Sequence, residues 1–319
     1  MTDVLIHSPF PRQDSQGNTT SALRLQRMLM ESGMEVALED VWYSGVEARW
    51  MVALNARRSA GAVAEFMDAC PRGRVVVVLT GTDINHPEVQ DPESDTCRTM
   101  KLADRLVVLH EASLAAVPKD FRDKCVVIHP SVQLPHGLQH KPRRGELFEV
   151  LMVGNIRREK NLPLAIEACR LLPQDAGIVV RVYGDAEGDL ANRLMEATAG
   201  PLPFQWRGKT DHTSLMELMA TSDLLLNTST QEGGANAICE ALGMGLPVLA
   251  SRISGNVGML GDDYEGLFPS EDAGDLAEML SRCAENAVFY QRLKLQVCAR
   301  SDQFMYQKES ELWTQLISC

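Results

Sequence analysis

The residues best suited to chemistry lie in one short stretch, T-S-T-Q-E-G-G-A-N-A-I-C-E, which covers 228–240 and follows the apolar run 224–226. It places two carboxylates, Glu232 and Glu240, eight positions apart. If a helix starts early in this stretch, that spacing is about two turns, and both side chains face one cleft. In the alternative interpretation, Glu232 is an acid favoured at a helix N-terminus and Glu240 is a solvated helix residue.

The same stretch has the features of a phosphate-binding turn. Gly233 and Gly234 let the backbone pass close to a ligand. The amides near Asn236 and Ala237 are expected at a helix N-terminus, where free N–H groups favour a diphosphate. A second strand-and-glycine pattern follows at 243–256, which favours a site over the structural alternative.

Two cations follow another predicted strand. The segment G-N-I-R-R-E-K-N, 154–161, comes directly after the apolar run at 148–153 and contains Arg157 and Lys160. Side chains of this type neutralise a leaving diphosphate. The alternative is an exposed basic turn, although a cation near the start of a helix opposes the helix dipole.

Three segments of the first half, 17–20, 55–59 and 80–83, also follow predicted strands, and together they predict a pocket for a small phosphate-like anion. They supply helix-start amides, hydroxyls and guanidinium groups. A capped helix, a solvated arginine pair and a strand-to-helix turn are the structural alternatives. The candidate residues are Gly17, Asn18, Thr19, Arg57, Arg58 and Thr82.

Short β-branched runs alternate with helical patterns along the whole chain, which favours parallel sheets. The run at 75–79 is continuously apolar, as expected of a strand buried on both faces. A helix is expected at 19–32. The predicted strands are 3–8, 35–39, 50–54, 75–79, 106–109, 125–128, 148–153, 178–183, 204–206, 223–227, 247–250 and 266–268.

This pattern predicts an α/β protein with two Rossmann-like, doubly wound domains and a cleft between them. The chain of 319 residues suits two cores better than one. We expect domains at 1–140 and 145–300, with a Pro- and Gly-containing linker at 133–146. A final helix at 301–319 is expected to cross back to the N-terminal domain.

Charge and composition restrict the partners. The net charge is −12, and nearly all of it lies after residue 144. Such a surface repels nucleic acid and anionic membranes, so an anionic substrate must be held by a few local cations. No signal peptide and no stable membrane anchor are expected, and scattered cysteines without a CxxC pair favour the cytoplasm.

Motifs for other chemistries are missing from the sequence. There is no D-x-D, no H-E-x-x-H and no G-x-x-x-x-G-K-[ST], and the seven histidines lack ligand spacing. We therefore expect no metal and no cofactor.

The two glutamates followed by G-x-G-x-P-V-x-A-S at 243–251 resemble the donor-site signature of glycosyltransferase family 4, which has the GT-B fold. The resemblance runs from about 148 to 270. The whole chain is more similar still to the bacterial selenosugar synthases of selenoneine biosynthesis. The segments that carry this resemblance are 17–24, 53–60, 77–83, 103–109, 232–242 and 247–261.

The resemblance implies a role for each donor-site residue. Glu240 would bind the ribose hydroxyls, and Glu232 would contact the sugar near its reacting end. Arg157 and Lys160 would hold the diphosphate, together with the amides from Gly234 to Ala237. Residues around Trp206 to Lys209 would border the uracil.

By the same resemblance, the substrates would be UDP-N-acetylglucosamine or UDP-glucose and selenophosphate, with Arg57, Arg58 and the Gly17–Thr19 amides holding the selenophosphate. Two alternatives stay open: a family 4 glycosyltransferase with another small-molecule or glycan acceptor, and an inactive nucleotide-sugar binding protein. A GT-B epimerase is a third.

Overall fold

The computed structural model describes residues 2–9, 17–40, 45–135, 138–142 and 145–318. The chain divides into two compact units, one formed by the residues up to Pro130 and from Tyr306 onward, the other by Ser131–Met305. The sequence predicts a linker at 133–146, of which 136–137 and 143–144 lie outside the described residues. Because Lys141 N donates to Ala220 O at 2.8 Å, the linker segment is tied to the second unit and the division falls earlier, after Pro130.

The first unit is built on a parallel six-stranded sheet of order β2-β1-β3-β4-β5-β6. Its strands are β1 (Thr2–Ser8), β2 (Val36–Asp40), β3 (Ala48–Leu54), β4 (Arg74–Leu79), β5 (Arg105–Val108) and β6 (Cys125–Val127). Its α-helices are α1 (Gly17–Glu31), α2 (Ala60–Ala69), α3 (Gly81–Ile84), α4 (Asp95–Leu102) and α12 (Tyr306–Ser318).

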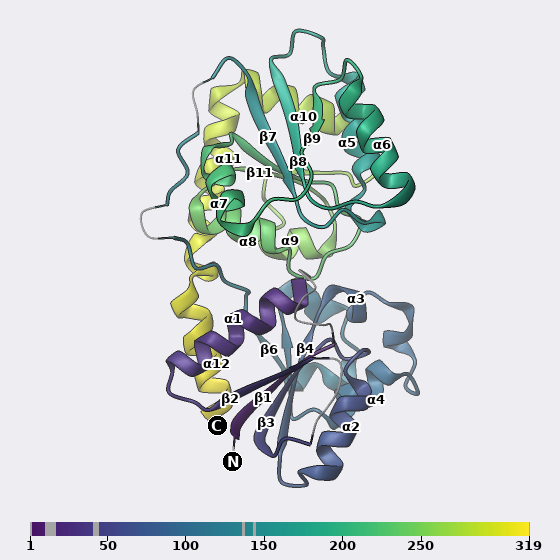
Figure 1. Cartoon of the computed structure of the whole chain (residues 1–319), viewed down its shortest axis with the longest axis vertical. Coiled ribbons are helices and arrows are strands. Elements are labelled where there is room, and N and C mark those ends of the chain that lie inside the picture. Colours follow the sequence, from purple (N-terminus) through teal and green to yellow (C-terminus); the bar gives the residue numbers. More distant parts are fainter. Residues whose placement is uncertain (1, 10–16, 41–44, 136–137, 143–144, 319) are drawn as a thin grey trace. The chain divides into compact units, whose positions relative to one another are not determined.

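Helices cover both faces of this sheet. Val76 and Val78 pack in one cluster with apolar residues of α1 and α12, whereas Val75 and Val77 pack in another with residues of α2 and α4. Successive side chains of a strand point to opposite faces, so an unbroken valine run is what a strand covered on both sides requires (Figure 1).

Helix α12 belongs to the first unit although it ends the chain. The guanidinium of Arg24 in α1 contacts the carboxylate of Glu309 at 3.0 Å, and both side chains are largely buried. Tyr306 Oη also donates to Glu31 at 2.8 Å. These contacts, together with buried Trp313, hold the last helix against α1.

The second unit repeats the plan with sheet order β12-β11-β10-β7-β8-β9, again parallel. Its strands are β7 (Phe148–Val153), β8 (Ile178–Tyr183), β9 (Phe204–Trp206), β10 (Leu224–Asn227), β11 (Val248–Ser251) and β12 (Leu267–Phe268). Its α-helices are α5 (Leu162–Leu171), α6 (Gly188–Ala199), α7 (His212–Thr221), α8 (Asn236–Met244), α9 (Ser254–Leu260), α10 (Ala273–Glu285) and α11 (Ala287–Arg300).

The apolar residues of this unit form one cluster around the sheet, in which α5 packs against α10, and α8 against β10 and α11. The prediction of two doubly wound α/β domains is confirmed, and each predicted strand is present with its ends shifted by two residues or fewer. No α-helix in the described ranges combines the length and the apolar character that crossing a membrane would need.

Candidate active site

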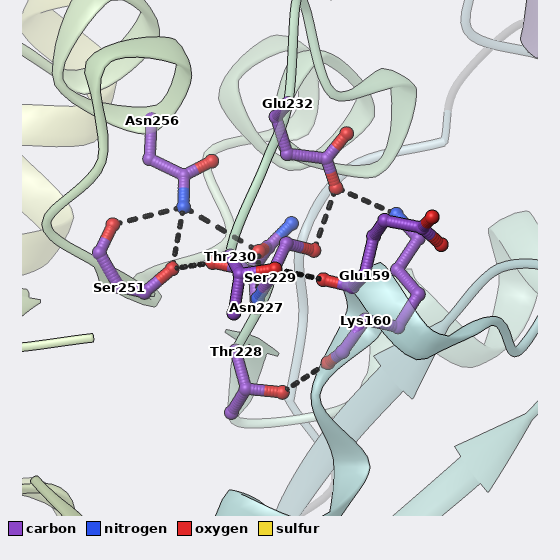
Figure 2. Close-up of polar contacts among 9 residues, drawn as sticks. All are labelled: Glu159, Lys160, Asn227, Thr228, Ser229, Thr230, Glu232, Ser251 and Asn256. Atoms are coloured by element: carbon purple, nitrogen blue, oxygen red, sulfur yellow. Dashed lines mark hydrogen bonds and ion pairs between the residues drawn. The ribbon is translucent and has the colours of Figure 1, made fainter. Parts of the chain in front are cut away.

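The loops after β7 and β10 lie side by side because these strands are parallel neighbours in the second sheet. Thr228 Oγ1 donates to the carbonyl of Lys160 at 2.7 Å, and Thr230 N donates to the carbonyl of Glu159 at 2.8 Å. Figure 2 shows the two loops joined in this way. Residues far apart in the sequence therefore meet at the carboxyl edge of the sheet, where parallel sheets bind ligands.

Glu232 is held by two donors on one of its oxygens (Figure 2). Lys160 Nζ lies 2.6 Å from Oε1, and Ser229 Oγ donates to the same atom at 2.7 Å. The Glu232 side chain is 14% exposed and that of Lys160 30%, so the pair is shielded but reachable. Within the described residues no contact reaches Oε2, which leaves one carboxylate oxygen for a hydroxyl of a ligand.

A buried polar network lies behind Ser229. Its amide donates to Asn227 Oδ1 at 3.0 Å, and its carbonyl accepts from Ser251 Oγ. Asn256 Nδ2 donates to Ser251 O at 2.9 Å and to Ser251 Oγ at 3.1 Å. These four residues are buried, so the network fixes the loop that carries Glu232. No sequence pattern marks Ser229, Ser251 and Asn256, because they lie in a loop, at the end of β11 and in α9, and they meet only in the folded unit.

Two glycines permit close backbone contacts around these loops. A Cβ added to Gly255, in α9, would lie 2.3 Å from the carbonyl oxygen of Glu232. One added to Gly184, after β8, would lie 2.0 Å from the carbonyl oxygen of Gly154. No larger residue fits either position unless the backbone moves, so both glycines serve packing at the site.

The predicted relation between the two glutamates is wrong. Helix α8 begins at Asn236, so Glu232 precedes it by four residues and lies in the loop. The two carboxylates are therefore not placed by two turns of one helix, and Glu232 is not an acid in the first turn of α8. The residue before the helix, Ala235, has an extended backbone (φ −65°, ψ 110°), which separates Glu232 from α8.

Glu240 lies in α8 and has a partner that the sequence analysis did not identify. His212, the first residue of α7, has its Nε2 2.9 Å from Glu240 Oε1. The hydrogen bond that His212 donates to Glu240 raises the pKa of His212 above its ordinary value, against a smaller opposing effect of burial. No spacing in the sequence predicts this pair, because the two residues lie on different helices.

The remaining candidates of this unit surround the loops. Arg157 precedes the 3₁₀ turn Arg158–Lys160 and is exposed; among the described residues its guanidinium makes no hydrogen bond or ion pair. Lys209 is exposed between β9 and α7. Asn236 and Ala237 form the first turn of α8, where amides have no partner within the helix. Cations and free amides of this kind suit an anion.

The largest cavity described here does not lie at the cluster of charged residues. A cavity of about 20 Å³, enough for one water molecule, lies between Lys160, Ser229 and Ala237. A much larger hollow of about 910 Å³ is lined by residues of α5, α10 and α11, among them Arg282 and Val288, and shares no residue with the site. We assign the site by its place at the carboxyl edge of the sheet, because no residue of the loops after β7 and β10 lines the large hollow.

In the first unit, Asn55 joins two of the three predicted anion-binding segments. It follows β3 with a φ of 74°, and its Nδ2 donates to Thr80 Oγ1 at 2.8 Å and to Thr82 Oγ1 at 2.9 Å. The Thr82 hydroxyl oxygen is thus already engaged, but a hydroxyl that accepts keeps its own proton to donate.

Asp83 completes this cluster from a fully buried position. One carboxylate oxygen accepts from Ala56 N at 2.8 Å, and the other accepts from Ile84 N at 3.0 Å and Thr80 Oγ1 at 3.2 Å. Burial raises the pKa of Asp83 to about 7, although these hydrogen bonds oppose the rise. Asp83 therefore shapes the loops after β3 and β4 without presenting a charge to solvent.

The two arginines lie at the edge of this cluster. Arg57 Nη1 is 3.1 Å from His86 Nε2 and 3.7 Å from a carboxylate oxygen of Glu88. The Arg57 side chain is partly exposed, and Arg58 is exposed. No spacing in the sequence predicts the contacts of Arg57 with His86 and Glu88.

The third predicted segment, Gly17–Thr19, forms the first turn of α1. In the described part of the chain no hydrogen bond joins it to Asn55 or Asp83, and residues 10–16 before it are not described. The end of β1 contributes a different residue, His7, whose Nδ1 lies 3.0 Å from Ser59 Oγ. The structure therefore brings together two of the three segments.

Across the described ranges, no three His, Cys, Asp or Glu side chains gather as a metal site would need. The polar groups of the second unit can hold an anion beside a group that offers hydroxyls. A family model agrees with this arrangement: residues 137–297, just over half of the chain, match the glycosyl transferases group 1. The chain belongs to the group 1 glycosyltransferases.

Two characterised proteins are similar to this group 1 glycosyltransferase. The amylovoran biosynthesis glycosyltransferase AmsK of Erwinia amylovora is 30% identical over 46% of this chain and 37% of its own length. The lipopolysaccharide glucosyltransferase WaaG of Escherichia coli K12 is 26% identical over 53% of this chain and 48% of its own. The matches thus span less than half of each relative.

Solved structures show the same fold over the full chain. Anabaena HepE in complex with UDP and glucose aligns with a TM-score of 0.79 at 15% identity, and covers 100% of both chains. Sucrose-phosphate synthase of Thermosynechococcus elongatus aligns with a TM-score of 0.81 at 15% identity, over 100% of this chain and 98% of that one. The GT-B fold is confirmed.

Proposed function

We propose that this group 1 glycosyltransferase transfers a hexose from UDP-N-acetylglucosamine or UDP-glucose to selenophosphate and releases UDP. The observation that carries the donor half is the Lys160–Glu232 pair, which sets a cation and a sugar-binding carboxylate 2.6 Å apart beside the N-terminal turn of α8. The similarity to HepE, whose structures contain UDP, glucose and UDP-glucose, supports a UDP-sugar donor.

On the donor side, each group has a separate task. Lys160 has three N–H donors and uses one on Glu232, so the others are available to the diphosphate. Arg157 adds a planar guanidinium that suits phosphate oxygens. These cations stabilise the charge that develops on departing UDP, and Glu232 Oε2 accepts a hydroxyl of the sugar. Glu240 takes the ribose hydroxyls, and Lys209 borders the uracil.

The acceptor half rests on the resemblance of both halves of the chain to selenosugar synthases and on the loops after β3 and β4. Arg57, Arg58 and the proton of the Thr82 hydroxyl are groups that bind a phosphate-like anion. Gly17, Asn18 and Thr19 offer amides in the first turn of α1. Selenophosphate is an anion at neutral pH, so the reaction needs little help from a general base.

The reaction balances without a metal or a redox partner. A selenium lone pair forms a bond to the anomeric carbon while the bond from that carbon to the UDP oxygen breaks, and its electron pair leaves with UDP. Water then cleaves the selenium–phosphorus bond and yields the 1-seleno-sugar and phosphate. The protein mainly has to position two anions and neutralise the one that leaves.

One assay tests the proposal. Purified protein is incubated with UDP-N-acetylglucosamine or UDP-glucose, with and without selenophosphate, and products are identified by mass spectrometry. We expect UDP release that depends on selenophosphate and a product that contains selenium. Orthophosphate in place of selenophosphate is the matched control, and should release no UDP above background.

The names of AmsK and WaaG favour a second candidate, transfer of the sugar to a growing glycan or lipopolysaccharide. UDP release only when a glycan acceptor is supplied would establish this candidate and refute selenophosphate. Binding of UDP-sugar with no turnover on any acceptor would instead identify an inactive nucleotide-sugar binding protein.

A further inference from the structure

His212 and Glu240 form a contact that the proposed function does not use. Nε2 of the imidazole lies 2.9 Å from Oε1 of the carboxylate. The Glu240 side chain is 12% exposed, whereas that of His212 is 64% exposed. A reachable ring is thus set against a shielded carboxylate, and in the described residues no other contact reaches Glu240.

The backbone of His212 is fixed by its neighbour. Asp211 caps α7, with Oδ1 accepting from Ser214 N at 2.9 Å and Oδ2 from Ser214 Oγ at 2.6 Å. His212 is therefore the first residue of a well-defined helix, and α7 packs against α8, which carries Glu240. The ring and the carboxylate approach each other from two elements with fixed positions.

Stability alone is a poor reason for this contact. A protonated imidazole at the first position of a helix opposes the positive end of the helix dipole, and an ion pair with one exposed partner contributes little. A single donor on Oε1 does, however, restrict the rotation of a flexible glutamate side chain, and it leaves Oε2 without a partner in the described residues.

We propose that His212 is a positioning residue of the nucleotide site, which holds Glu240 so that its second oxygen accepts the vicinal hydroxyls of the ribose. This inference rests on the proposed binding of a UDP-sugar. In this proposal His212 affects nucleotide binding through Glu240 and does not contact the reacting atoms. A carboxylate restrained before binding loses less conformational freedom when the nucleoside diphosphate arrives, so affinity increases.

The test measures affinity for two ligands by isothermal titration calorimetry: UDP, and 2′,3′-dideoxy-UDP, which lacks both ribose hydroxyls. Since ordering one long side chain changes affinity by roughly two- to tenfold, we expect His212→Ala to weaken UDP binding by that factor. The same variant should bind dideoxy-UDP as the wild type does. A purely structural role would weaken both ligands equally.

Two further variants complete the design. His212→Gln keeps an N–H donor at a similar reach and should restore most of the UDP affinity. Thr213→Ala changes the adjacent exposed residue on the same turn and should bind both ligands like the wild type. Thermal unfolding of each variant verifies that it is folded.

The outcomes distinguish failure of the proposed UDP-sugar donor from failure of the proposed role of His212. If the wild type binds no UDP, the proposed donor is wrong and this inference falls with it. If the wild type prefers UDP over dideoxy-UDP and Glu240→Gln removes that preference, but His212→Ala does not reduce it, only the role of His212 is refuted.

Discussion

The two clusters at the carboxyl ends of the sheets use their carboxylates in opposite ways. In the second unit, Glu232 is paired with a cation, and both side chains remain partly exposed. In the first unit, Asp83 is fully buried, and its partners are two backbone amides and one hydroxyl. One cluster keeps charge available to a ligand, while the other uses a carboxyl to hold two loops together.

The two clusters therefore supply charge to the two halves of the proposed reaction in different ways. The second unit has 16 Lys and Arg against 23 Asp and Glu, a net charge of −7, so a diphosphate there needs cations beside it, and Lys160 and Arg157 supply them. In the first unit the cations stand outside the buried cluster, where Arg57 already contacts His86 and Glu88. Four experiments test this contrast, and the expected effect decreases from Lys160 to His212.

Lys160→Ala tests whether the charged cluster acts on the leaving group. The variant removes the cation beside the diphosphate and leaves Glu232 without its ion-pair partner, so we expect kcat/KM for UDP release to fall about 10²–10³-fold. Steady-state kinetics at saturating acceptor measures the loss. Arg158→Ala, in the same 3₁₀ turn, is the control and should stay near wild type. Equal losses in both variants would refute a specific role of Lys160.

Arg57→Ala tests whether the first unit supplies the charge for the acceptor. A hydrogen bond from a charged group contributes about 1.5–3 kcal/mol, so we expect kcat/KM for selenophosphate to fall roughly 10–100-fold. UDP affinity, measured by calorimetry, should not change. Unaltered kinetics in selenophosphate would show that Arg57 does not hold the acceptor.

Gly255→Ala tests whether close packing behind Glu232 positions its loop. The added Cβ would lie 2.3 Å from the Glu232 carbonyl oxygen, so the loop must shift, and we expect a loss of about 1–3 kcal/mol in unfolding free energy. Urea denaturation measures the change. Gly61→Ala in α2 is the matched control: nothing lies within 4 Å of its Cβ, and a helical alanine is favoured by about 0.5–1 kcal/mol. A neutral result at Gly255 would contradict the tight packing.

The smallest effect concerns the pH dependence of the His212–Glu240 pair. The pKa of His212 is raised above 6.5, so the charged pair stabilises the fold fully below the unfolded-state pKa and loses this contribution as pH rises through the folded-state pKa. Because His212 is mostly exposed, we expect at most a few tenths of a kcal/mol. Urea denaturation of wild type and His212→Gln, below and above that range, should show a difference that shrinks with increasing pH. A growing difference would reverse the assigned sign.

Much of the fold was predictable because its signals are local. A short β-branched run such as Val75–Leu79 favours a strand buried on both faces, and alternation with helical segments indicates a parallel sheet. The place of the site was predictable for the same reason, since glycine and charged residues directly after a strand lie at the carboxyl edge. The start of α8 was not predictable, because the glycine pair after Glu232 permits either a helix or a loop.

The contact partners of the site residues could not be predicted from the sequence. Lys160 and Glu232 are 72 positions apart, and they meet because β10 lies beside β7 in the sheet, an order that no pattern along the chain encodes. Likewise Glu240 meets His212 because α7 packs against α8.

The strands, their alternation with helices and the loops that carry chemistry can all be predicted from the amino-acid sequence. Each of these follows from the preferences of neighbouring residues for backbone geometry and burial. The packing of the folded chain, in contrast, sets which donor holds which carboxylate oxygen, and it encloses Asp83 while Glu232 stays reachable. Side-chain contacts act over a few ångströms, so they exist only once the sheet order and helix packing have brought distant segments together.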